Sequence, residues 1–252
     1  MSGHSKWAGI KHKKAVVDAK RGQVFTKVAA ELTVSAREGG ADPSGNFRLR
    51  LAIQKARDVN MPADNIERAI QRGVGGKDGV QLEDIRYEGY GPHGVAVMVD
   101  VLTDNRNRTV AALRNLFTRA GGSLGETNSV AWMFSQKGII QVSPGEADPE
   151  ELALEVLDAV DVGEDGDVSV EGDTVQVTVA PNRFEEVRRT IEEKGWTVAS
   201  AEVTMQPSTS VELDAKQAPA VLRLLDAIED HDDVQQVYAN AEIPDEVLES
   251  VG

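Results

Sequence analysis

The chain has 252 residues, of which 40% are hydrophobic and only 4% aromatic, and its formal net charge is −15. This length suits two or three compact units with largely aliphatic cores. The lack of any cysteine excludes a disulfide framework, a cysteine-ligated metal and a thiol nucleophile.

Membrane association is not expected. No apolar run approaches the ~20 residues that a membrane-spanning helix needs, and no apolar stretch of signal-peptide length follows the basic N-terminus. We therefore expect a cytoplasmic protein that binds no membrane.

The charge is distributed unevenly along the chain. Residues 1–77 carry 15 Lys and Arg against 7 Asp and Glu, a balance of +8, whereas residues 78–252 carry 12 against 35, a balance of −23. Such asymmetry indicates a part that binds a polyanion, attached to parts that repel polyanions. Nucleic acid is the commonest cellular polyanion, so it is the expected partner.

The basic side chains concentrate in the first thirty residues. We expect a nucleic-acid contact formed by Lys6, Trp7, Lys11, His12, Lys13, Lys14, Lys20, Arg21 and Lys27. Lysines are point charges that suit phosphates and position a protein without reading base sequence. Trp7 could stack on an unpaired base or pin the segment to the protein. The alternative is a solvated lead-in to the first helix.

Three helices are predicted after this segment. Apolar residues at helical spacing predict a helix over 16–38, ended by Gly39-Gly40. Asp42-Pro43 predicts the N-cap and first position of a second helix, with a buried stripe of Phe47, Leu51, Ala52, Ala56 and Val59. A third helix runs over 62–73. Their polar faces would extend the positive surface through Arg48, Arg50, Lys55, Arg57, Arg68 and Arg72.

Residues 73–79 read as a linker, and strands and helices alternate after it. Strands are predicted at 82–90, 95–102, 130–134, 138–142, 168–170, 174–179, 196–205, 210–213 and 234–240, and helices at 109–120, 149–160, 181–194 and 219–229. The fold class is therefore α+β and multidomain: a three-helix bundle followed by two α/β sandwich domains, one inserted in the other. The predicted domains are a basic helical domain over 1–77, a discontinuous α/β domain over 78–134 and 208–252, and a ferredoxin-like insertion over 135–207.

The segment Asp104-Asn-Arg-Asn-Arg-Thr opens a predicted helix. Arg106 and Arg108 beside a helix N-terminus could grip a phosphate. Alternatively Asp104 or Asn105 caps the helix while both arginines pair with the acidic body.

Other candidate sites are weak. The four histidines are scattered, and the acidic clusters 161–167 and 229–233 lack a calcium-loop pattern, so no metal or other cofactor is expected. The glycine-rich segment 89–94 joins two strands and is better interpreted as a hairpin turn than as a phosphate loop. No local catalytic signature is present, and a non-enzymatic role is expected. The competing classes are an enzyme with its site between the α/β domains and an adaptor that binds protein alone.

Several longer motifs resemble those of the YebC family, which includes the PmpR-type bacterial regulators and the mitochondrial translational activator of cytochrome oxidase. The resemblance covers the whole chain. It is carried by Gly3-His-Ser-Lys-Trp-Ala, Lys11-His-Lys-Lys, Asp18-Ala-Lys-Arg-Gly, Asn60-Met-Pro-Ala-Asp-Asn-Ile-Glu-Arg-Ala-Ile, Tyr87-Glu-Gly-Tyr-Gly-Pro, Leu102-Thr-Asp-Asn-Arg-Asn-Arg-Thr and Ser129-Val-Ala-Trp-Met-Phe-Ser. Phe47 is a departure, because family members often have proline there.

The resemblance implies three domains and a cytoplasmic, non-enzymatic role in gene expression. Members are described as transcriptional regulators that bind DNA, and also as translation factors that act on the ribosome and ease difficult peptide-bond formation. We expect a monomeric nucleic-acid-binding regulator. Its target is DNA by the family's usual label, whereas the lysine-rich segment physically favours ribosomal RNA.

Overall fold

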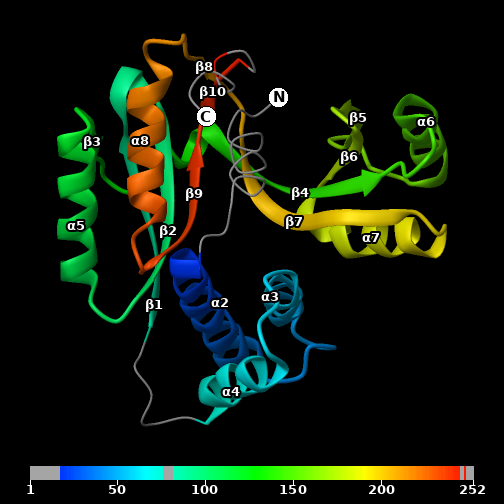
Figure 1. Ribbon diagram of the computed structural model, residues 1–252, viewed down its shortest axis with the longest axis horizontal. Coiled ribbons are helices and arrows are strands. Elements are labelled where there is room, and N and C mark those ends of the chain that lie inside the picture. Colours follow the sequence, from blue (N-terminus) through cyan, green and yellow to red (C-terminus); the bar gives the residue numbers. More distant parts are fainter. Residues whose placement is uncertain (1–17, 76–81, 245–246, 248–252) are drawn as a thin grey trace. The chain divides into compact units, whose positions relative to one another are not determined.

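The computed structural model describes residues 18–75, 82–244 and 247, with side chains from residue 22 onward (Figure 1). The chain divides into two compact units, one formed by residues 1–133 with 207–252 and the other by residues 134–206. The boundaries predicted within and between the three domains stay predictions.

The first unit begins with three helices, α2 (Asp18–Gly39), α3 (Phe47–Asp58) and α4 (Ala63–Val74). Leu32 of α2, Leu49 and Ala56 of α3 and Ala69 of α4 lie in their common core. At Gly73 an added Cβ would lie 2.3 Å from the carbonyl oxygen of Thr33. Glycine therefore allows α4 to pass close to α2.

The prediction that Asp42-Pro43 starts the second helix is wrong, because Asn46 is the N-cap of α3. Its buried side chain accepts a hydrogen bond from the backbone N–H of Leu49 and donates to the carbonyl oxygens of Ser35 and Gly40. These bonds fasten the end of α2 to the start of α3. Asp42 instead accepts hydrogen bonds from Ser44 in the preceding turn.

The predicted buried stripe of this helix is only partly confirmed. Ala52 and Ala56 are buried, but Leu49 occupies the position next to them in the core. Phe47, Leu51 and Val59 are half-buried. The helix begins after the cap at Asn46, four residues later than the sequence signal at Asp42 suggested.

The same unit contains a four-stranded antiparallel sheet in the order β3-β1-β2-β9. Its strands are β1 (Glu83–Tyr90), β2 (Ala96–Thr103), β3 (Ser123–Leu124) and β9 (Val234–Ala239), with a 3₁₀ turn at Pro92–Gly94. A separate parallel pair joins β8 (Val211–Glu212) to β10 (Ala241–Glu242).

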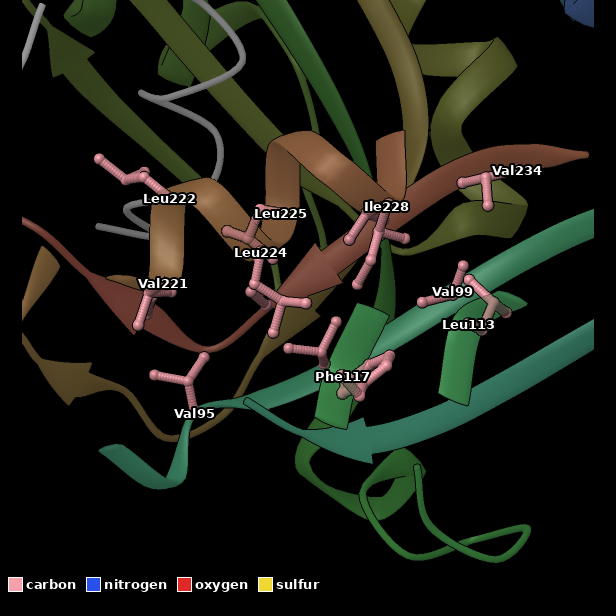
Figure 2. Packing of buried hydrophobic residues seen from close by; sticks show 14 of the residues in the cluster. Val95, Val99, Leu113, Phe117, Val221, Leu222, Leu224, Leu225, Ile228 and Val234 are labelled. Atoms are coloured by element: carbon pink, nitrogen blue, oxygen red, sulfur yellow. The ribbon is translucent and has the colours of Figure 1, made fainter. Parts of the chain in front are cut away.

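Two helices, α5 (Arg106–Arg119) and α8 (Ala218–Glu229), cover one face of this sheet (Figure 1). The alternating residues Val97, Val99 and Val101 of β2 point into the layer between sheet and helices. Figure 2 shows aliphatic side chains of α8 gathered above Val95 and Val99, next to Phe117 of α5. This single apolar layer holds both helices to the sheet.

The strand predicted at 130–134 is wrong over 130–133, and only Phe134 belongs to a strand. Glu88, only 4% exposed, accepts backbone N–H bonds from Asn128, Val130 and Ala131, each 2.8 Å long. These N–H groups are therefore unavailable to a neighbouring strand, and the chain forms a 3₁₀ turn at Ala131–Met133. Trp132 projects from this turn with 69% of its surface exposed.

The second unit is a four-stranded sheet in the order β5-β6-β4-β7 with two helices. Its elements are β4 (Phe134–Ser143), α6 (Pro149–Ala159), β5 (Asp167–Glu171), β6 (Thr174–Val179), a 3₁₀ turn at Pro181–Arg183, α7 (Phe184–Glu193) and β7 (Thr197–Pro207). Along the chain the elements follow the order strand, helix, two strands, helix, strand. Together with the strand order in the sheet, this forms a split β-α-β arrangement of the ferredoxin-like type.

Replacing Glu88 by glutamine tests the role of the buried carboxylate. We expect Glu88→Gln to lower the free energy of unfolding by about 1–3 kcal/mol, because an amide N–H₂ would face at least one backbone N–H. Urea denaturation measures this change, with Glu126→Gln in the same loop, where the side chain is exposed, as the control. Equal stability of the two variants would contradict the assignment.

Candidate nucleic-acid interface

Most of the predicted interface lies outside the described residues. Lys6, Trp7, Lys11, His12, Lys13 and Lys14 belong to this part of the chain. Lys20 and Arg21 lie in the first turns of α2, but their side chains are also outside the description. Lys27, Arg106 and Arg108 are therefore the predicted contacts whose side chains can be placed.

Lys27 is engaged within the protein. It is half-buried, and its Nζ donates a hydrogen bond to the carbonyl oxygen of Glu229, with 2.5 Å between the atoms. One turn earlier, Gln23 Nε2 lies 3.4 Å from the carboxylate of Asp232. The acidic segment 229–233 thus faces the first half of α2, so Lys27 could meet a phosphate only by exchanging this partner.

Arg48 forms the densest ion-pair cluster among the described residues. Its guanidinium lies 2.8 Å from Glu31, 2.7 Å from Glu38 and 2.8 Å from Asp84. Burial acts to lower the pKa of Arg48, but the hydrogen bonds and negative charges of Glu31 and Asp84 outweigh it. The pKa therefore lies above its ordinary value, and the guanidinium stays charged. Three carboxylates surround this one cation, so Arg48 does not extend the positive surface, contrary to the sequence interpretation.

Four hydrogen bonds between the helices and the segments next to the sheet share one direction. Gln23, Lys27, Arg37 and Arg48 all donate, and they donate to oxygen atoms of the segments around β1 and β9. Arg37, for instance, reaches the carbonyl oxygen of Leu82 over 2.7 Å. We call these four contacts the donor seam. It is a polar junction, in contrast to the apolar cores on either side of it.

Other cations of the bundle differ in their surroundings. Arg50 donates to the carbonyl oxygens of Pro43 and Ser44, and Arg68 to Asp64 and Asn65. The remaining three bases of the predicted positive face are exposed, and no ion pair joins them to a carboxylate of the described ranges. They are Lys55, Arg57 and Arg72.

The start of α5 matches the alternative interpretation in its cap and in one of the two arginines. Asn105 caps the helix by accepting a hydrogen bond from the N–H of Arg108. The Arg108 guanidinium lies 2.8 Å from Asp104 and 3.2 Å from Asp233. Arg106 is exposed at the first helical position. Of the two arginines, Arg108 is already neutralised, and Arg106 stays available to solvent.

Asp233 is the half-buried acceptor that closes this end of α5. Burial acts to raise its pKa, but hydrogen bonds from Thr109 at 2.6 Å, from Arg108 and from Thr103 outweigh it, so the pKa lies below its ordinary value. The carboxylate therefore joins β9 to the first turn of α5.

Sequence interpretation passed over two further cations of α5. Arg114 and Arg119 are exposed on its outer face. The signal that could have found them is the acid content: residues 105–125 contain four arginines and neither aspartate nor glutamate.

No group of three His, Cys, Asp or Glu side chains within the described ranges could hold a metal ion. Among those same residues, no helix is both long and apolar enough to cross a membrane.

Family models match both parts of the chain. The TACO1/YebC protein N-terminal domain matches residues 5–76, and the TACO1/YebC second and third domain matches residues 82–241. The chain belongs to the TACO1/YebC family. The resemblance inferred from its motifs is thus confirmed.

Relatives in the TACO1/YebC family match the chain over its full length. Proteins named probable transcriptional regulatory protein are 53% identical over 251 residues in Geotalea uraniireducens and 52% identical over 252 residues in Shewanella oneidensis, covering 100% of both chains in each case. The crystal structure of a conserved hypothetical protein from Aquifex aeolicus is similar with a TM-score of 0.81 at 44% identity, over 92% of this chain and 94% of that one. The α+β multidomain fold class is confirmed.

Asp233→Asn tests the closure of α5 and its pH dependence. Because the folded pKa is lowered, the stabilisation is present above the ordinary pKa of about 4 and is lost as pH falls through the folded value. We expect Asp233→Asn to cost about 1–3 kcal/mol at pH 7, with the difference from wild type shrinking below pH 4. Urea unfolding at several pH values measures it, with the exposed Glu83→Gln as control. A difference independent of pH would contradict the assignment.

Arg48→Gln tests the donor seam. The change leaves Glu31, Glu38 and Asp84 without their shared cation, so we expect faster amide hydrogen exchange in α2 and α3. Added salt should also speed amide exchange in these two helices of the wild-type protein, since salt screens the ion pairs. Arg57→Gln, at an exposed position of the same helix, is the matched control. Unchanged protection in Arg48→Gln would show that the seam does not depend on this cluster.

Proposed function

We propose that this protein is a non-enzymatic regulator of gene expression that holds nucleic acid through its basic N-terminal module. The observation that carries the proposal is the segregation of charge, +8 over residues 1–77 against −23 over residues 78–252. The names of its relatives as probable transcriptional regulatory proteins support a role in gene expression.

The chemistry of the module favours phosphate contacts over base reading. Up to residue 27 lysines outnumber arginines six to one, and lysine meets phosphate as a point charge. The exposed Lys55, Arg57 and Arg72 of the bundle add to this cationic supply. We therefore propose structured RNA of the ribosome as the natural target, with a role in translation. DNA, which the name transcriptional regulatory protein implies, is the second candidate.

The acidic remainder of the chain has a defined part in this proposal. A body of net charge −23 repels phosphate chains, so it confines binding to the basic module and limits the approaches that a nucleic acid can take. We also propose that the acidic domains contact protein partners, and that the protein is a cytoplasmic monomer.

Neutralising the lysine cluster tests the mechanism. The triple variant Lys11→Gln, Lys13→Gln, Lys14→Gln removes three proposed phosphate contacts. We expect the slope of log K against log salt to become shallower by about 2–2.7. The measurement is binding to ribosomes and to duplex DNA across a salt series. A control triple variant with the same charge change is Arg189→Gln, Lys194→Gln, Lys216→Gln.

The two targets give different results in this assay. Tighter binding to ribosomes than to duplex DNA at near-physiological salt supports the RNA proposal. Tight, sequence-dependent binding to duplex DNA under those conditions would overturn it in favour of DNA. Full affinity in the lysine triple variant would overturn the electrostatic mechanism for both targets.

A further inference from the structure

Helix α5 has a charge pattern unlike the rest of the acidic body. Residues 78–252 contain 35 acids in 175 positions, one in five, so the 21 residues 105–125 would hold about four at that frequency; they hold none. Four arginines fall in the same stretch, all of them on α5. An ordinary solvated helix face mixes both signs of charge, and this face carries one sign only.

The outer face of α5 is rich in hydrogen-bond donors as well as positive. Asn107, Arg114 and Thr118 follow one row along the helix, and Arg108, Asn115 and Arg119 follow the adjacent row. All six are exposed. Arginine, asparagine and threonine are among the residue types that contact phosphate and sugar. The Thr118 hydroxyl donates to the carbonyl oxygen of Arg114, so the neutral donors that this face offers beside its arginines are the amides of Asn107 and Asn115.

The cations on this face are open to an external partner. Arg108 is neutralised by Asp104 and Asp233. By contrast, no carboxylate within the described ranges pairs with Arg114 or Arg119 of this face. Arg106 is exposed at the start of the helix, but it lies on the row of the buried Leu113 and Phe117. Bringing a polyanion to Arg114 and Arg119 would therefore break no internal ion pair, whereas Lys27 would have to give up its hydrogen bond to the carbonyl oxygen of Glu229.

The helix that carries these side chains is rigidly held. Its first turn is fixed by the Asn105 cap and by the hydrogen bond from Thr109 to Asp233. Leu113 and Phe117 are fully buried on its inner face. A binding surface on such an element loses little conformational freedom when a ligand binds.

The geometry points to the outer face of α5 as a second contact for the sugar-phosphate backbone of a nucleic acid, separate from the basic N-terminal module. The face is about 20 Å long, from 14 residues at 1.5 Å each. A duplex presents on the order of ten phosphates over that length. Helix α5 packs beside α8 against the sheet (Figure 1), so its outer face is the side left for such a contact.

This inference rests on the proposed function, since it assigns a second site to the same class of partner. It also changes the picture of how that partner is held. Contacts from two elements fix the orientation of a nucleic acid, whereas one lysine cluster would only tether it.

The test is a salt series with the double variant Arg114→Gln, Arg119→Gln in the full chain. Loss of two phosphate contacts should make the slope of log K against log salt shallower by about 1.4–1.8. The control variant Arg189→Gln, Lys194→Gln has the same charge change at exposed positions of α7 and of the residue after it, and should leave the slope unchanged. Urea denaturation of both variants checks that each is folded. The probes are ribosomes and a duplex DNA.

The outcomes separate this inference from the proposal on which it rests. If wild type binds neither probe, the proposed function fails. If the lysine triple variant loses affinity while Arg114→Gln, Arg119→Gln matches its control, only the α5 site is overturned. Crosslinks from a photoreactive residue at position 115 should map to nucleic acid; crosslinks to an acidic protein instead would overturn the assignment of the partner.

Discussion

The first unit depends on the donor seam, in which the helices supply hydrogen-bond donors and the segments around β1 and β9 supply the acceptors. Arg48 is its centre, because this single guanidinium joins Glu31 and Glu38 of the bundle to Asp84 of β1. Within the part of the chain that the structure describes, the apolar core of the bundle and that of the sheet are separate clusters. Attraction of this kind is weakened by salt and by competing ions. A phosphate chain is such a competitor, since it offers acceptors to the same donors.

This arrangement links the charge of the whole chain to its architecture. The acidic balance of residues 78–252 is too large to be explained by solubility alone. Part of it has a structural use, because Asp84 and the segment 229–233 meet donors of the helices. Under the proposed function, the same carboxylates would also keep phosphate chains away from the sheet side.

The sequence predicted the α+β class and most elements, because helical spacing, alternation and glycine-proline punctuation are local signals. It failed where a distant side chain set the backbone. The strand expected at 130–134 gave way to a turn because Glu88, forty residues earlier, binds its N–H groups. Asn46 replaced Asp42 as a cap through bonds to the end of α2. Pairings such as Arg48 with Asp84 are likewise invisible in one sequence, since they depend on tertiary contact.

For the candidate interface, too, the sequence supplied local information and missed tertiary contacts. Counting charges located the basic module, but it could not tell an available cation from a neutralised one. Arg48, Lys27 and Arg108 are bound to partners of the same chain, whereas Arg114 and Arg119, on a helix within the acidic half, are not bound to any carboxylate of the described ranges. Net charge over a domain sets the long-range approach of a polyanion, but contact is made only where a cation has no internal partner to lose. By that criterion the outer face of α5 is better prepared for phosphate than several basic residues of the bundle itself.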